Sequence, residues 1–221
     1  VIALLNSQMS IIRNLSEKVQ HNSPKLNWKN RIKLRFNQQK KIITVEFGDI
    51  EIEHRYEYWA SGVQFIYTPS GERALMNLIS AMSRGESPYF FGSSSCGKKY
   101  MISDIASIFG TYIYDIPSFH NKTNLILERL LIGAARTGFW LTFHSLHFYS
   151  QQNLCFLYET VHEIMNKKNA KEKSCYISGN KYEMSSSYPV IFFTGDRTIY
   201  QSKTIPHQFR SYLKPIAMSP P

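Results

Sequence analysis

The chain has 221 residues, 43% of them hydrophobic, which is enough for one main folded domain and a smaller attached piece. We expect neither a membrane span nor a secretory signal, because no run of about eighteen apolar residues and no basic, cleavable leader is present. Cys96, Cys155 and Cys175 are spaced like neither zinc ligands nor a disulfide framework, which favours a reducing, intracellular compartment.

The 26 lysines and arginines outnumber the 16 aspartates and glutamates, for a formal net charge of +10. Such a charge is typical of proteins that bind nucleic acid. The basic residues are scattered, however, with local clusters at residues 25–35, 40–41 and 167–173. A solvated face or loop explains them better, so we expect no nucleic-acid partner. A strongly salt-dependent affinity for DNA or RNA would indicate the opposite.

The opening part of the chain predicts a helix and then a small sheet. Apolar residues recur every three or four positions over residues 2–19, which is typical of one apolar stripe on a helix. Apolar runs among charged residues follow, and they predict a small amphipathic sheet or an arm laid on a neighbour. These runs cover residues 26–36, 42–47 and 50–52, with a turn at Gly48 and Asp49.

Further along, strands and helices alternate. The expected strands are residues 63–67, 89–91, 111–116, 139–143 and 190–194, and the expected helices are residues 72–82, 100–109, 124–135, 153–166 and 208–213. Residues 68–71 are expected to break a strand, and residues 167–173 to form a charged loop. Gly179 and Asn180 mark a hairpin turn, and residues 215–218 are expected to lead the chain out of the domain. This alternation predicts an α/β fold with a mainly parallel sheet and helices on both faces.

A glycine-rich stretch follows the aromatic strand at residues 89–91. Gly92, four intervening residues, Gly97 and Lys98 have the spacing of a loop that cradles phosphates. Glycines let successive backbone N–H groups curl around an anion, the next helix presents its positive end, and the lysine reaches the outer phosphates. The candidate nucleotide-binding residues of this loop are Gly92, Ser93, Ser94, Ser95, Cys96, Gly97, Lys98 and Lys99.

Lys99 departs from this motif, because the position after the lysine normally carries a hydroxyl that coordinates magnesium. Residues 139–143 lead into His144 and Ser145, where a nucleotide hydrolase of this architecture has two acids. Imidazole is a poor magnesium ligand and serine is a weak base. Losing a positioned base costs roughly 10²- to 10⁴-fold in rate. We therefore expect no metal ion and no hydrolysis at this site.

Two smaller signals have plain structural explanations. His144 and His147 lie three residues apart, but no acidic or cysteine ligand is near them in sequence, so a metal pair is disfavoured. Cys96 lies where a helix start lowers the pKa of a thiol. A small residue that fits a tight loop explains Cys96 better.

In the order and the sequence of their motifs, residues 28–218 resemble the first ATPase module of dynein heavy chains, an AAA+ P-loop module, together with the end of the linker before it. The resemblance is carried by Tyr56-Glu57-Tyr58, Ile66-Tyr67-Thr68-Pro69 with Arg73, the phosphate loop, residues 130–143 and Lys214-Pro215-Ile216-Ala217-Met218. It implies a linker segment over residues 1–58 and a truncated AAA+ large subdomain over residues 59–221. It also implies that the backbone near Thr68 and Pro69 contacts adenine.

The departures from this family fall on its catalytic positions. The magnesium hydroxyl is Lys99, the two acids are His144 and Ser145, the sensor asparagine is Asp196, and the arginine finger is Lys214. An arginine finger is worth roughly 10³ to 10⁵ in rate, and in this family it acts on a neighbouring module's site. Binding of ATP or ADP stays open, because Lys98 and Lys99 attract phosphates whereas Asp196 repels them.

Three hypotheses about function follow. The first is a structural or regulatory part of a dynein-like ring in microtubule-based movement, binding nucleotide at most and contacting adjacent AAA+ modules of the same chain. The second is an active ATP-hydrolysing motor module, and the third is a basic nucleic-acid binder. The resemblance further implies dynein intermediate and light chains as partners, microtubule contact outside this segment, no membrane, and the cytoplasmic cytoskeleton, including a cilium or flagellum axoneme, as the location.

Overall fold

The computed structural model describes residues 9, 12, 32–39, 41–47, 50–57, 68–117, 124–187, 189–196 and 205–219. The helix expected over residues 2–19 lies outside the described residues except at Met9 and Ile12, which are helical. The turn at 48–49 and the strand at 63–67 also lie outside them.

The chain forms two compact units, residues 1–65 with 100–111 and residues 66–99 with 112–221. The expected boundary at residue 58 stays a prediction. None of the described helices is long and apolar enough to cross a membrane.

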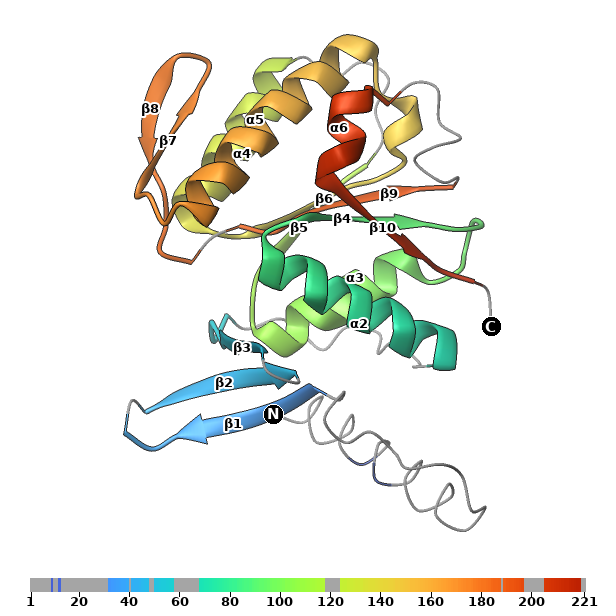
Figure 1. Cartoon of the computed structure of the whole chain (residues 1–221), viewed down its shortest axis with the longest axis vertical. Helices are drawn as coiled ribbons and strands as arrows, with labels where there is room; N and C mark the ends of the chain where they lie inside the picture. Colours follow the sequence, from blue (N-terminus) through green and yellow to red (C-terminus); the bar gives the residue numbers. More distant parts are fainter. Residues whose placement is uncertain are drawn as a thin grey trace. The chain divides into compact units, whose positions relative to one another are not determined.

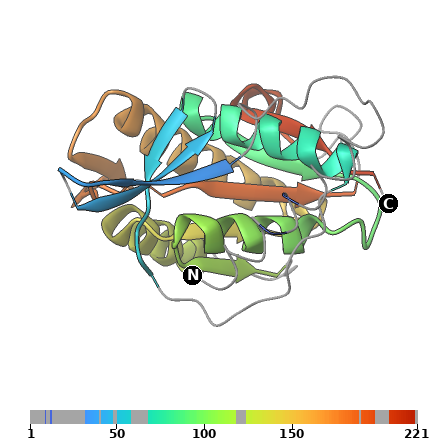
Figure 2. The same cartoon turned by 90° about the horizontal axis from the view of Figure 1, so that it is seen from below.

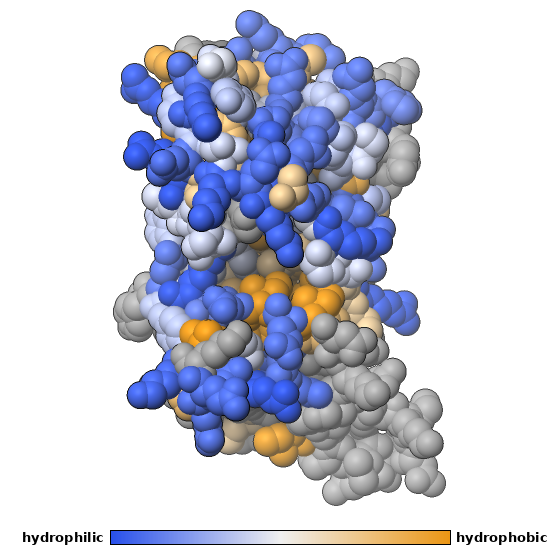
Figure 3. All heavy atoms as spheres, turned by 60° about the vertical axis from the view of Figure 1, so that its left-hand side comes forward, coloured by the Kyte–Doolittle hydropathy of each residue, from blue (hydrophilic) through white to orange (hydrophobic). Residues whose placement is uncertain are grey.

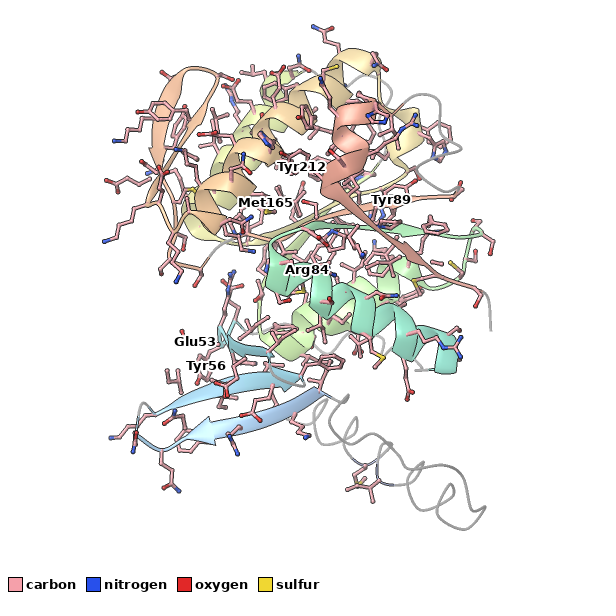
Figure 4. The ribbon with its side chains drawn as sticks, viewed as in Figure 1. Glu53, Tyr56, Arg84, Tyr89, Met165 and Tyr212 are labelled. Atoms are coloured by element: carbon pink, nitrogen blue, oxygen red, sulfur yellow. The ribbon has the colours of Figure 1, made fainter. Side chains whose placement is uncertain are left out.

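A three-stranded antiparallel sheet is the main element of the first unit (Figure 1). β1 (Ile32–Asn37), β2 (Ile42–Phe47) and β3 (Ile50–Glu53) pair in this order, which confirms the small sheet, one of the two structures that the sequence predicted here. After β3, Arg55 N–H donates to the Phe109 carbonyl at 3.0 Å. Tyr56, labelled in Figure 4, returns to the sheet, where its hydroxyl accepts a hydrogen bond from Ile43 N–H. These bonds hold the segment after β3 to the end of helix α3 (Lys98–Phe109) and to β2.

A five-stranded parallel sheet organises the second unit (Figures 1 and 2). Its strand order is β10-β4-β9-β6-β5, and every neighbouring pair is parallel. The strands are β4 (Ser87–Phe91), β5 (Ile113–Ile116), β6 (Trp140–Phe143), β9 (Ile191–Gly195) and β10 (Leu213–Ala217). Every residue of β6 and β9 is buried, because a parallel sheet is covered on both faces. This explains their continuous apolar sequences.

Helices cover both faces of this sheet, as predicted. Helix α2 (Pro69–Arg84) packs against β4 and β10 on one face, and α4 (Asn124–Thr137), α5 (Gln151–Asn169) and α6 (His207–Tyr212) lie on the other (Figure 1). The main core lies under α4, α5 and α6. Tyr89 of β4 and Met165 of α5, both labelled in Figure 4, belong to it. The α/β fold with a mainly parallel sheet is therefore confirmed.

An antiparallel hairpin, β7 (Ser174–Ile177) and β8 (Asn180–Glu183), follows α5, where the sequence predicted one. Its turn residues are Ser178 and Gly179, with φ of +50° and +81°, and so lie one position before the expected pair. Two consecutive positive φ angles are the requirement of a two-residue hairpin turn. Hydrophilic side chains predominate on the upper part of the view in Figure 3, where this hairpin lies.

Three local predictions differ from the structure. Residues 68–71 begin α2, because the Thr68 hydroxyl accepts a hydrogen bond from Gly71 N–H at 3.2 Å and caps the helix. The charged loop at 167–173 is shorter than expected, because α5 continues to Asn169, with two lysines in its favourable last turn. Residues 215–218 belong largely to β10, in which buried Ile216 lies beside buried Phe90 of β4. A short 3₁₀ helix, η2 (Leu146–Phe148), was not predicted.

Candidate functional site

The glycine-rich loop connects β4 to α3, in the order strand, loop and helix that the motif requires. A Cβ atom added to Gly92 would clash with the Met218 carbonyl oxygen, so only glycine fits beside the end of β10. Gly97 has a φ of +87°, which lets the chain turn directly into α3. Cys96 is buried within the loop, whereas the three serines before it are exposed. The two glycines of the motif thus stand at positions where the backbone needs them.

The Lys98 ammonium lies over this loop. Its Nζ donates to the carbonyl oxygens of Gly92 and Ser93, both at 2.8 Å, and lies 3.7 Å from the Cys96 sulfur. A carboxylate oxygen of Asp196, the residue after β9, is 3.8 Å away. Only 13% of the Lys98 side chain is exposed, so the charge is held in the loop and does not extend into solvent.

Lys99 and His144 meet at a carboxylate that the sequence did not single out. Asp115 of β5 places one oxygen 2.9 Å from Lys99 Nζ and the other 3.4 Å from His144 Nε2. The two substituted positions are therefore joined through Asp115. Because Lys99 is an ammonium without a lone pair, this arrangement puts a fixed side-chain cation where the motif otherwise binds a metal ion.

Thr194, the buried fourth residue of β9, connects His144 and Ser145. Its hydroxyl oxygen accepts a hydrogen bond from Ser145 N–H at 3.2 Å and lies 3.3 Å from His144 Nδ1. The His144 ring therefore lies between the Thr194 hydroxyl and the Asp115 carboxylate. Ser145 itself has a left-handed backbone with φ of +52°.

The Asp115 carboxyl titrates below its ordinary range. Burial would raise its pKa, but hydrogen bonds from His144 and Lys99 and their charges outweigh burial, and the pKa lies below the usual value of 3.8. The folded state therefore favours the ionised carboxyl, and its contribution to stability is present above that value and is lost as the pH falls through the lowered pKa.

We expect Asp115→Asn to lower the free energy of unfolding by about 1 kcal/mol at neutral pH, because the site is only partly buried. The difference from the unsubstituted chain should shrink as the pH falls below the ordinary value of 3.8 and should vanish once the pH is below the lowered pKa, where the carboxyl is protonated in both states. Urea unfolding followed by circular dichroism between neutral and acidic pH measures it. Glu183→Gln on the exposed hairpin is a matched control. A pH-independent difference would contradict the assigned ion pairs.

Asp196 also lies near two groups besides Lys98. His147 Nε2 is 3.9 Å from its other carboxylate oxygen. Burial, and then the negative charge of Asp196, raise the pKa of Tyr89 to about 12, so this phenol stays neutral at physiological pH. Among the described residues, no group of three or more His, Cys, Asp or Glu side chains forms a metal site.

The structure brings most of the candidate residues together. Lys98, Lys99, His144, Ser145 and Asp196 lie at the carboxyl ends of neighbouring strands, where α/β sheets bind ligands. Lys214 does not join them: it pairs with Pro88 near the beginning of β4, four residues before Gly92. The Thr68 side chain caps α2, whose first residue is Pro69. Whether their backbone contacts adenine stays a prediction.

The sequence analysis did not single out Asp115 and Thr194. The signal was present, because both lie at or next to the carboxyl end of a predicted core strand. Carboxyl ends of parallel strands meet at one edge of a sheet, so a polar residue there is a site candidate even without a motif. His147 was weighed only as a metal ligand, whereas the structure places it beside Asp196.

A family model described as the hydrolytic ATP binding site of the dynein motor region matches residues 54–221. The chain belongs to this dynein family. The match covers the glycine-rich loop and every residue of the charged network described above.

Curated dynein heavy chains resemble most of the chain. Cytoplasmic dynein 2 heavy chain 1 of Rattus norvegicus is 19% identical over 216 residues, which is 96% of this chain and 5% of that protein. Dynein axonemal heavy chain 2 of Homo sapiens is 24% identical over 194 residues, 85% of this chain and 4% of that protein. The chain thus spans about one twentieth of the length of these dyneins.

Among solved structures, a point mutant of Thermotoga maritima RuvB aligns with 66% of this chain and 44% of its own. The TM-score is 0.48 and the identity is 16%.

The residues around Lys99 do not fit a magnesium ion. Magnesium requires several oxygen ligands. The position after Lys98 offers an ammonium instead, and the nearby carboxylate of Asp115 is already engaged by Lys99 and His144. We therefore derive no chemical step through a metal ion.

Proposed function

We propose that this chain is a dynein-type module that binds ADP or ATP without requiring magnesium and does not hydrolyse ATP. One observation carries the proposal: Lys99 Nζ lies 2.9 Å from Asp115, whose other oxygen contacts His144. Two positions that serve catalysis in the family are thereby committed to a partly exposed, intramolecular charge network.

Nucleotide binding would use parts of the site that are intact. Backbone N–H groups of the loop and of the first turn of α3 would donate hydrogen bonds to the phosphate oxygens. Lys98 needs only to exchange its two carbonyl acceptors, Gly92 and Ser93, for phosphate oxygens. Lys99 stands beside Lys98 in sequence, and the part of its charge that Asp115 does not neutralise adds to the attraction of phosphates.

Hydrolysis would lack both its base and its metal ion. At the end of β6, the His144 imidazole is held between Asp115 and Thr194, and the Ser145 hydroxyl is too weakly basic to activate water. The nucleotide therefore acts as a structural ligand that stabilises the module. Its free energy of binding adds to the stability of the folded state.

The family membership supports a place in a long dynein-like chain. Relatives of this chain are about twenty times longer, and their names include cytoplasmic and axonemal dynein heavy chains. We propose that the module has a structural or regulatory role in such a chain, in contact with adjacent modules and, by family, with intermediate and light chains. The proposed location is the cytoskeleton, including the cilium.

Titration calorimetry with ADP and with ATP, each in EDTA and in magnesium, tests the nucleotide site. We expect binding of at least one nucleotide, with a dissociation constant that magnesium changes less than about threefold, because Lys99 replaces the metal ligand. Lys98→Ala should weaken binding by about tenfold or more, through loss of a charged hydrogen bond to phosphate.

Lys173→Ala, which removes an exposed lysine far along the chain from the loop, is the matched control and should bind as the unsubstituted protein does. No binding heat from either nucleotide in either buffer would contradict the proposal. Binding that requires magnesium would favour the alternative, an active ATPase module.

A further inference from the structure

We infer that Asp196 makes this loop select nucleoside diphosphates over triphosphates. The inference rests on the proposed nucleotide binding and names the ligand of that same site. It follows from the position of one carboxylate relative to the lysine that should contact the outer phosphates.

Asp196 occupies the region of the terminal phosphate. In this loop motif the lysine reaches the β- and γ-phosphates, and an Asp196 oxygen lies 3.8 Å from the Lys98 ammonium. Any anion that approaches Lys98 from the side of β9 therefore meets a carboxylate of the same sign. The carboxylate follows β9 directly, and that strand is buried along its whole length.

The nearby positive charges do not offset the repulsion between the Asp196 carboxylate and a third phosphate. Lys98 is its direct partner, and Lys99 is paired with Asp115 at 2.9 Å. His147 Nε2 lies 3.9 Å from the second Asp196 oxygen, beyond hydrogen-bond distance. Two lysines thus face two aspartates, and a bound triphosphate would add more negative charge than the site can balance.

A diphosphate avoids this conflict. Its phosphates can take the loop N–H groups and replace the Gly92 and Ser93 carbonyls as acceptors of the Lys98 hydrogen bonds. The ion pair with Asp196 can then persist. A γ-phosphate would compete with Asp196 for the same ammonium. Because 52% of the Asp196 side chain is exposed, solvent screens the repulsion, and we expect a preference of about tenfold, not thousands.

The experiment compares ADP with the non-hydrolysable imido analogue of ATP by titration calorimetry in EDTA. The unsubstituted protein should bind ADP about tenfold more tightly than the analogue. In Asp196→Asn the ratio should fall below about threefold, mainly through tighter binding of the triphosphate. Glu183→Gln removes an exposed carboxylate on β8 and should leave the ratio unchanged, which controls for net charge.

The outcomes separate this inference from the proposed function. Equal affinities in the unsubstituted protein overturn the inference and leave nucleotide binding standing. An ADP preference that survives Asp196→Asn overturns the assignment to Asp196. Binding of neither nucleotide overturns both. Circular dichroism of Asp196→Asn shows whether it is folded. If it is not, Asp196→Ser provides the second neutral variant, with the same expected ratio.

Discussion

The purified chain is expected to release no phosphate from ATP above the rate of its own Lys98→Ala variant, with or without magnesium. Loss of a positioned base costs roughly 10²- to 10⁴-fold. The substitution at the metal-binding position adds to this loss. A metal ion stabilises the charge that develops between the transferred phosphate and the leaving group, and the Lys99 ammonium cannot do so to the same extent. A steady-state phosphate-release assay measures the rate. Turnover clearly above that of Lys98→Ala would show an active ATPase and refute the proposed function.

Restoring the family residues tests the same prediction through a gain of activity. In Lys99→Thr with His144→Asp and Ser145→Glu, a hydroxyl and two carboxylates return to the start of α3 and the end of β6. This triple variant should gain phosphate release that depends on magnesium and exceeds the background by about tenfold or more. Adding Lys98→Ala to the triple variant should abolish the gain. A folded triple variant with no activity would mean that other departures, such as Asp196, also block hydrolysis.

Phe193→Ala is expected to lower the free energy of unfolding by about 3–5 kcal/mol, the largest effect on stability that we predict. Phe193 lies in the middle of β9 and is completely buried. Its ring stacks on Phe143 of β6 at 5.5 Å and meets Phe209 of α6 edge-on at 5.2 Å. Truncation leaves a cavity between the sheet and α6. The loss is a large part of the roughly 5–15 kcal/mol that stabilises a typical domain.

Urea unfolding followed by circular dichroism measures this loss. Tyr176→Ala removes an aromatic ring of which about half is exposed on β7, and it should change stability by less than about 0.5 kcal/mol. If Phe193→Ala does not fold, Phe193→Leu retains most of the volume and should cost less than about 2 kcal/mol. A loss below about 1 kcal/mol in Phe193→Ala would show that the aromatic cluster is not the centre of the core.

Much of the fold could be predicted because its signals are local. Continuous apolar runs marked β4, β6 and β9, helical spacing marked α4 and α5, and the spacing of Gly92, Gly97 and Lys98 marked the loop. β10 was missed because Pro215 interrupts a short stretch that follows a helix directly, and sequence patterns treat such a proline as an exit. On an edge strand, proline is tolerated.

The sequence by itself determined the fold class and the glycine-rich loop, because both follow from residue type and spacing, and its resemblance to dynein ATPase modules identified the substituted positions. Only the tertiary structure decided what the substitutions do together. Asp115 meets both Lys99 and His144, and His144 meets Thr194 fifty residues away, because parallel strands carry distant residues to one edge of the sheet. No spacing within the chain encodes those contacts, since the strand order β10-β4-β9-β6-β5 sets them.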